Sequence, residues 1–181
     1  SATQSAWVAG PTSLPMTSLT GAVNLVRLKS MPGSDRIGLA ALDANSRLSA
    51  AIWNGTTWVD NSNLTTAASV ATKASFDIAW ETLSGDLLAL WGTGTTTNYR
   101  KWYSTSTWAG TFSGPNPAAA VQWIRMASDP LSNKAGVTYI YGTASWNAAI
   151  WRATGAETWT ASTADTAISQ GTTRVTDCAW Q

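Results

Sequence analysis

The chain has 181 residues, of which 44% are hydrophobic and 12% are charged, and its formal net charge is +1. This hydrophobic content is that of a globular domain with a sizeable core, and the small net charge gives no electrostatic basis for binding nucleic acid or an anionic membrane. The absence of histidine and the single cysteine exclude the usual zinc sites, an intrachain disulfide and most nucleophile–base pairs. No stretch approaches 18 consecutive apolar residues, so we expect no membrane insertion, and we also expect no metal and no cofactor.

Tryptophan recurs along the chain at a fixed interval. Trp7, Trp58, Trp108 and Trp159 are separated by 51, 50 and 51 residues, and the last three each follow a threonine. A period of this size predicts a repeat architecture.

In chain order, each repeat opens with a predicted strand, followed by a turn built from the residues that tight turns require. The first strands are predicted at 26–30, 76–80 and 124–128. The turns after them are predicted at 32–35, 83–86 and 130–133.

The second strand of each repeat is almost wholly apolar, which indicates a strand that is covered on both faces. These strands are predicted at 37–42, 87–91 and 136–141, and the third strands at 48–53, 98–103 and 146–151. A short turn such as 54–56 then leads to a brief fourth strand that carries the periodic tryptophan. Longer polar stretches, such as 61–73 and 161–173, are expected to cross from the outer edge of one repeat to the inner strand of the next.

Four short strands in about 50 residues, joined by hairpins and without helical periodicity, are typical of a propeller blade. We therefore predict an all-β, β-propeller-like array that forms a single Trp-rich domain over residues 1–181. The complete units are predicted at about 25–74, 75–122 and 123–174, with a split unit made from 1–24 and 175–181.

The split unit is the basis of an assembly hypothesis. The stretch 77–81 returns as 177–181, which places a first strand at the end of the chain and a fourth strand near its start. Exposed strand edges invite pairing, so neighbouring copies would complete the unit; alternatively, the two ends close a degenerate blade within one chain. The expected assembly edge comprises Ala6, Trp7, Val8, Asp177, Cys178, Ala179 and Trp180.

One segment resembles a known family. The stretch from Ile37 to Trp58, which ends in Trp-Asn-Gly-Thr-Thr-Trp, is similar to the blades of fungal and bacterial fucose-binding propeller lectins. The resemblance implies a carbohydrate-binding propeller. The family holds fucose with an arginine and a glutamate, however, and the matching positions here are Leu39 and Ala50, so the resemblance does not extend to those polar partners.

Twelve tryptophans far exceed the usual frequency, and six recur at equivalent positions in the repeats. They either wedge between blades as core or line inter-blade pockets, where an aromatic face stacks on a sugar ring. The candidate ligand-binding residues are Trp53, Trp58, Trp102, Trp108, Trp151 and Trp159.

A catalytic function has little support in the sequence. Asp77, Glu81 and Asp177 lie on or beside first strands, and a carboxylate pair there would suit glycosidase chemistry. No second element of a catalytic constellation accompanies them, so we expect carboxylates with structural roles and no catalytic residues.

The sequence thus favours a non-catalytic extracellular or cell-surface module that self-assembles into a ring or filament, its partners being copies of itself. The alternative is a propeller lectin that binds glycans in Trp-lined pockets. The repeat of about 100 residues also suggests a piece of a longer array.

Overall fold

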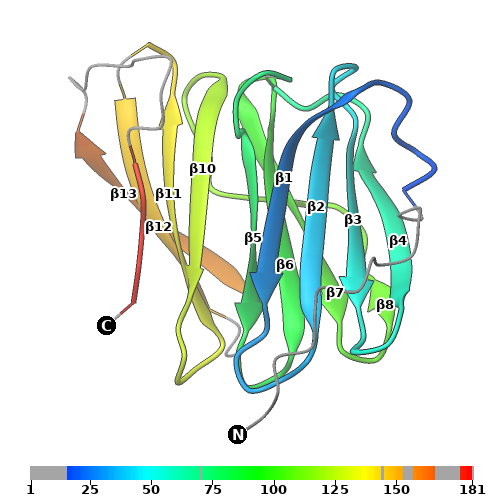
Figure 1. Ribbon diagram of the computed structural model, residues 1–181. Helices are drawn as coiled ribbons and strands as arrows, with labels where there is room; N and C mark the ends of the chain where they lie inside the picture. The colour runs from blue at the N-terminus through cyan, green and yellow to red at the C-terminus, as the bar shows by residue number, and fades with distance from the viewer. Residues whose placement is uncertain (1–15, 70, 144, 153–156, 166–175, 181) are drawn as a thin grey trace, which may run out of the picture.

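The computed structural model describes residues 16–69, 71–143, 145–152, 157–165 and 176–180. These residues form strands and connecting turns, and none of them belongs to a helix that could cross a bilayer. Three antiparallel sheets stand side by side like leaves of a fan (Figure 1). The predicted all-β propeller architecture is confirmed in this part of the chain.

We call the three sheets blades 1 to 3, and each follows the up-and-down order of its strands. Blade 1 comprises β1 (Val23–Ser30), β2 (Ile37–Asp43), β3 (Leu48–Trp53) and β4 (Trp58–Thr65). Blade 2 comprises β5 (Phe76–Glu81), β6 (Asp86–Thr93), β7 (Thr96–Tyr103), β8 (Thr107–Trp108) and β9 (Phe112–Ser113), the last of which also pairs with β7. Blade 3 comprises β10 (Val121–Ser128), β11 (Lys134–Tyr141), β12 (Ser145–Arg152) and β13 (Thr158–Asp165).

The first, second and third strands of each blade match the predicted positions to within about three residues, a normal uncertainty for element ends. The fourth strands differ from the prediction. β4 and β13 are eight residues long and take in 61–65 and 161–165, which we expected to be crossing segments. These outermost strands accept polar side chains because one of their faces meets solvent, so polarity alone is a poor guide to where they end.

Neighbouring blades pack face to face through alternate residues of their strands. We call the side of a blade that faces the next blade in the chain its forward face, and the other side its back face. Between blades 1 and 2, the forward-facing Ala40, Leu42 and Ile52 meet the back-facing Trp80 and Trp91 in one buried cluster. A second cluster joins blade 2 to blade 3 in the same way.

The back face of blade 1 is only partly covered. Met16 and Leu19 pack on Leu39 and Ala41 there. On β1, Leu28 remains 59% exposed, and its neighbours Val23 and Val26 are also exposed. The described residues therefore present an open apolar face at this end of the fan.

The interface between blades 2 and 3 also contains a buried charge cluster centred on Lys101. Its ammonium lies 3.0 Å from Glu81, 3.1 Å from Asp86 and 2.9 Å from Glu157. Burial alone would lower the pKa of Lys101, but its hydrogen bonds to these carboxylates raise the pKa well above its ordinary value. Glu81 also accepts a hydrogen bond of 2.6 Å from Trp151 Nε1, which ties the cluster to blade 3.

Substitution of Lys101 by methionine tests this cluster. The change leaves buried carboxylates without their counter-ion, so we expect the free energy of unfolding to fall by about 3–5 kcal/mol in chemical denaturation. Lys134→Met, at an exposed position on β11, is the matched control and should be nearly neutral. Equal stability of the two variants would show that the cluster does not hold blades 2 and 3 together.

Candidate functional site

The six candidate tryptophans form one cross-strand pair in each blade, between the third and fourth strands. Trp53 pairs with Trp58, Trp102 with Trp108 and Trp151 with Trp159. The rings of the first pair lie 5.7 Å apart and those of the last pair 5.1 Å apart. The sequence period thus corresponds to a recurring aromatic pair.

The pairs differ in how much of each ring is open. Trp102 and Trp151 are 1% and 0% exposed, because each faces the preceding blade and is covered by it. Trp102 Nε1 donates to Asp60 of blade 1 at 3.0 Å, so this ring is part of the interface core.

The other four tryptophans are half-buried. The guanidinium carbon of Arg100 lies 5.7 Å from the centroid of the Trp108 ring. The ring centroids of Tyr99 and Trp159 lie 5.9 Å apart. Trp53 and Trp58 lie at the open end of the fan, where no preceding blade is described. Ligand contact by the six residues stays a prediction.

The expected assembly edge is described only at its C-terminal half, since Ala6, Trp7 and Val8 lie outside the described residues. The segment 176–180 runs along the forward face of blade 3. Trp180 Nε1 donates to Ala127 O at 2.7 Å, and the Cys178 thiol lies 3.4 Å from Arg125 O. Both acceptors belong to β10.

This segment repeats the geometry of β5. Trp80 Nε1 on β5 donates to Lys29 O of blade 1 at 2.9 Å, and Lys29 and Ala127 occupy equivalent places on β1 and β10. Asp77 and Asp177 each accept from the backbone N–H of the residue that follows. The 100-residue sequence repeat is therefore also a structural one, and 176–180 has the contacts of a fourth inner strand.

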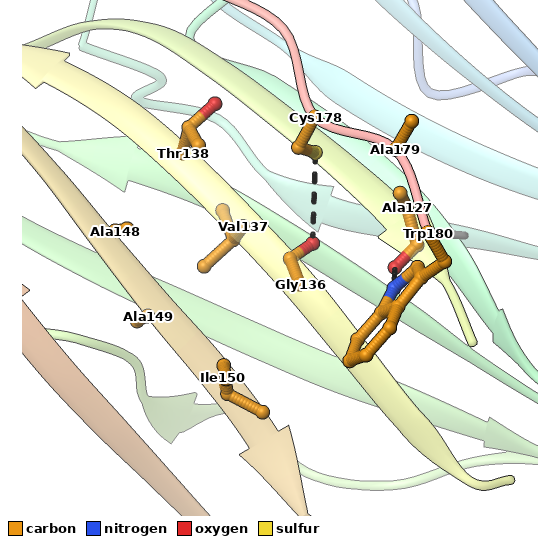
Figure 2. Close-up of a pocket in the computed structure, with 10 residues that line it drawn as sticks. All are labelled: Ala127, Gly136, Val137, Thr138, Ala148, Ala149, Ile150, Cys178, Ala179 and Trp180. Carbon is orange, nitrogen blue, oxygen red and sulfur yellow. Dashed lines mark hydrogen bonds between the residues drawn. The ribbon is translucent and has the colours of Figure 1, made fainter.

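A groove of about 210 Å³ opens between this segment and blade 3 (Figure 2). Cys178, Ala179 and Trp180 form one side, β11 forms the floor, and the side chain of Ile150 on β12 stands on the other side. The lining is mostly apolar, and Ile150 is 37% exposed. The indole of Trp180 is held in place by its hydrogen bond to Ala127, so it forms a fixed aromatic wall.

Comparison with blade 1 explains why the groove at blade 3 is open. Gly38 on β2 corresponds to Gly136 on β11. A Cβ atom on Gly38 would lie 2.9 Å from Leu87 of β6, whereas the nearest atom to one on Gly136 would be Trp180 Nε1, at 3.6 Å. At blade 3, the space that Leu87 takes at blade 1 is open within the described residues.

The candidate carboxylates are engaged in structural contacts. Asp77 is buried and accepts backbone N–H donors from Ile78 and Met126, each at 2.9 Å. Burial is the largest influence on the pKa of Asp77 and raises it, although Lys29 and the two N–H groups act in the opposite direction. Glu81 belongs to the Lys101 cluster. The described residues contain no group of His, Cys, Asp and Glu that would hold a metal.

The polar partners of the resemblance are absent from the structure as well as from the sequence. Leu39 and Ala50, at the positions of the family's arginine and glutamate, are both buried core residues. Blade 1 therefore has no polar sugar clamp at this place.

No protein-family model matches the sequence, and no curated protein matches it. Among solved structures, it is similar to the BP39L lectin from Burkholderia pseudomallei, with a TM-score of 0.53 and 16% identity over 77% of this chain and 40% of that chain. It is also similar to AofleA from Arthrobotrys oligospora, with a TM-score of 0.53 and 14% identity over 85% of this chain and 44% of that chain. A third similar structure is the Aleuria aurantia lectin, a six-bladed propeller, with a TM-score of 0.50 and 11% identity over 82% of this chain and 49% of that chain.

This chain has the β-propeller fold of these lectins. It spans less than half the length of each of them. At such low identity the likeness concerns the fold alone.

The sequence does not predict a ligand site at the groove. It does predict that Cys178, Ala179 and Trp180, which form one side of the groove, belong to an assembly edge. The repeat of 77–80 at 177–180 was the signal that could have located the groove. Trp180 is not one of the six tryptophans that recur at equivalent positions in the repeats, so that recurrence does not select it.

The two equivalent glycines test this account of the groove. We expect Gly38→Ala to lower the free energy of unfolding by about 1–3 kcal/mol, because the new methyl overpacks against Leu87. Gly136→Ala should change it by less than about 0.5 kcal/mol, since the methyl enters the groove at an ordinary contact distance. Chemical denaturation measures both, and a larger loss for Gly136→Ala would mean that the groove is filled in solution.

Proposed function

We propose that this chain is a non-catalytic carbohydrate-binding propeller module whose binding site is the groove beside Trp180. The observation that carries the proposal is an open groove with a fixed indole wall, in a chain that has the fold of propeller lectins. An aromatic face of this kind matches the apolar face of a sugar ring.

The chemistry of the groove limits the ligand. Its volume of about 210 Å³ is below the roughly 300–1,000 Å³ of sites for drug-sized ligands, so it suits one sugar ring. Its lining contains no charged side chain. We therefore expect a neutral sugar held by stacking and a few backbone or hydroxyl contacts, with weak affinity.

Calorimetric titration with a monosaccharide panel that includes methyl α-L-fucoside tests this function. We expect Trp180→Ala to weaken binding by about tenfold or more and Trp180→Phe to retain most of it, because phenylalanine keeps an aromatic face. Trp58→Ala, at the other end of the fan, is the matched control and should bind as the unaltered chain does.

Two results would contradict the proposal. One is the absence of binding to any sugar of the panel. The other is loss of binding in Trp58→Ala with Trp180→Ala unaffected, which would assign the ligand to the Trp53–Trp58 pair. A thermal melt of each variant separates loss of binding from loss of folding.

Self-assembly is a second candidate function, and one observation favours it. The groove at blade 3 leaves open the place that Leu87 of blade 2 fills at blade 1. At the other end of the fan, the back face of blade 1 exposes Val26 and Leu28. Apolar faces at both ends of the fan would suit strands or blades from further copies. An extracellular or cell-surface location likewise stays a prediction.

Light scattering distinguishes this second candidate. A chain of 19.1 kDa that assembles through its open blades should show a mass that is a multiple of this value. We expect Leu28→Glu on β1 to reduce that mass to one chain, because a charge on an apolar interface is poorly solvated there. A mass of 19.1 kDa for the unaltered chain at every concentration would exclude assembly.

A further inference from the structure

A second cavity, of about 260 Å³, lies among the inner strands and shares no lining residue with the groove. We call it the inner-strand cavity; it is lined by Arg27, Lys29, Asp77, Arg125 and Asp177. All five side chains are ionisable, in a chain with few charges. We propose that this cavity binds a small oxyanion, such as the carboxylate or sulfate group of an acidic sugar.

The repeat places these charges in alternation. Arg27 on β1 and Arg125 on β10 occupy equivalent positions, opposite Ala40 and Thr138 of the second strands. Each guanidinium donates to the carbonyl of the residue before it, Arg27 at 3.2 Å and Arg125 at 3.0 Å. Asp77 lies on β5, between β1 and β10 in the chain, and Asp177 lies in the segment 176–180, which follows blade 3; each accepts from the N–H of the next residue. Cationic and anionic positions thus follow one another across the cavity.

The balance of charge favours an anionic ligand. Three cations and two carboxylates line the cavity, which leaves an excess of one positive charge. Asp177 is exposed, so water screens its carboxylate, whereas Asp77 is fully buried. A concave site with an excess of one sign concentrates ions of the opposite sign.

Asp77 forms long ion pairs with two of the cations that line the cavity. Its two oxygens accept the N–H groups of Ile78 and Met126. Arg27 Nε and Lys29 Nζ each lie 3.8 Å from the carboxylate, beyond the 2.7–2.9 Å of a charge-assisted hydrogen bond. A carbonyl acceptor, Met126 O, holds the Lys29 ammonium at 2.9 Å. An oxyanion that entered the cavity would complete shorter contacts than Asp77 provides.

Guanidinium groups favour oxyanions because their N–H donors match two oxygens of a carboxylate, sulfate or phosphate. The shared chemistry of the ligand is therefore an oxyanion, and its source is either a free inorganic ion or an acidic sugar. The inference does not rest on the proposed function, since the groove and this cavity have separate linings.

Calorimetric titrations at constant ionic strength test the inference, with sodium sulfate, sodium D-glucuronate and uncharged D-glucose as probes. We expect sulfate or glucuronate to bind and glucose not to bind at this cavity. Binding of glucuronate identifies the acidic sugar as a ligand, and binding of sulfate alone supports a free oxyanion. Absence of binding by both anions overturns the proposal, as does equal binding of glucose and glucuronate that Trp180→Ala leaves unchanged.

Charge variants give changes of opposite sign, so a folding defect cannot imitate the result. We expect Arg27→Gln to weaken anion binding about fivefold and Asp177→Asn to strengthen it by a similar factor. This factor corresponds to the interaction of two unit charges about 4 Å apart in water. Lys134→Gln removes an exposed cation elsewhere and should change nothing. If Asp177→Asn weakens binding, or Lys134→Gln weakens it as much as Arg27→Gln, the cavity is not the site.

Trp180→Ala separates this inference from the proposed function. It should weaken binding of the neutral sugar by about tenfold or more without weakening anion binding, because the three cations that line the cavity belong to β1 and β10. Failure of one binding activity with retention of the other therefore shows which of the two sites is wrongly assigned.

Discussion

The close packing of one sheet on the next is the constraint on which the other features of this structure depend. Blade 1 offers small residues on its forward face, such as Gly38 and Ala40, and receives large ones, such as Trp80 and Leu87, from the back face of blade 2. The indole N–H of Trp80 then bonds the inner strand of the preceding blade, which fixes the depth at which the sheets meet. Buried apolar area supplies most of the stabilisation.

The same packing rule explains why the candidate site lies at blade 3. At blade 1, Leu87 on the second strand of blade 2 fills the hollow above Gly38. At blade 3 the described following residues are 176–180, whose Trp180 bonds Ala127 as Trp80 of β5 bonds Lys29. An aromatic wall therefore stands beside an open apolar floor, the arrangement that suits either a sugar ring or a further strand.

Charge is used sparingly and in two ways. The Lys101 cluster is enclosed between blades 2 and 3, and its carboxylates all converge on one ammonium. The inner-strand cavity is open, and two of its cations, Arg27 and Lys29, form ion pairs of 3.8 Å with Asp77. The first arrangement holds two blades together, whereas the second leaves room for a ligand.

Strand positions could be predicted from the sequence because apolar second strands and turn residues recur with the tryptophan period. The extent of β4 and β13 could not, since outer strands tolerate polar residues. Nor could the burial of Trp102 and Trp151 be separated from the half-burial of Trp53, because these tryptophans repeat at equivalent places and differ only in whether a preceding blade covers them. The groove lies where, within the described residues, no side chain takes the place that Leu87 fills at blade 1, and no local pattern in the sequence encodes this.

The most direct test of the central claim is a ¹⁵N–¹H spectrum of the tryptophan indoles during titration with the sugars that bind. The Trp180 signal is assigned from the spectrum of Trp180→Phe, and those of Trp102 and Trp151 from the corresponding phenylalanine variants. The account predicts that the Trp180 indole signal shifts with sugar concentration while the buried Trp102 and Trp151 signals stay in place. An unmoved Trp180 signal under saturating sugar would contradict it.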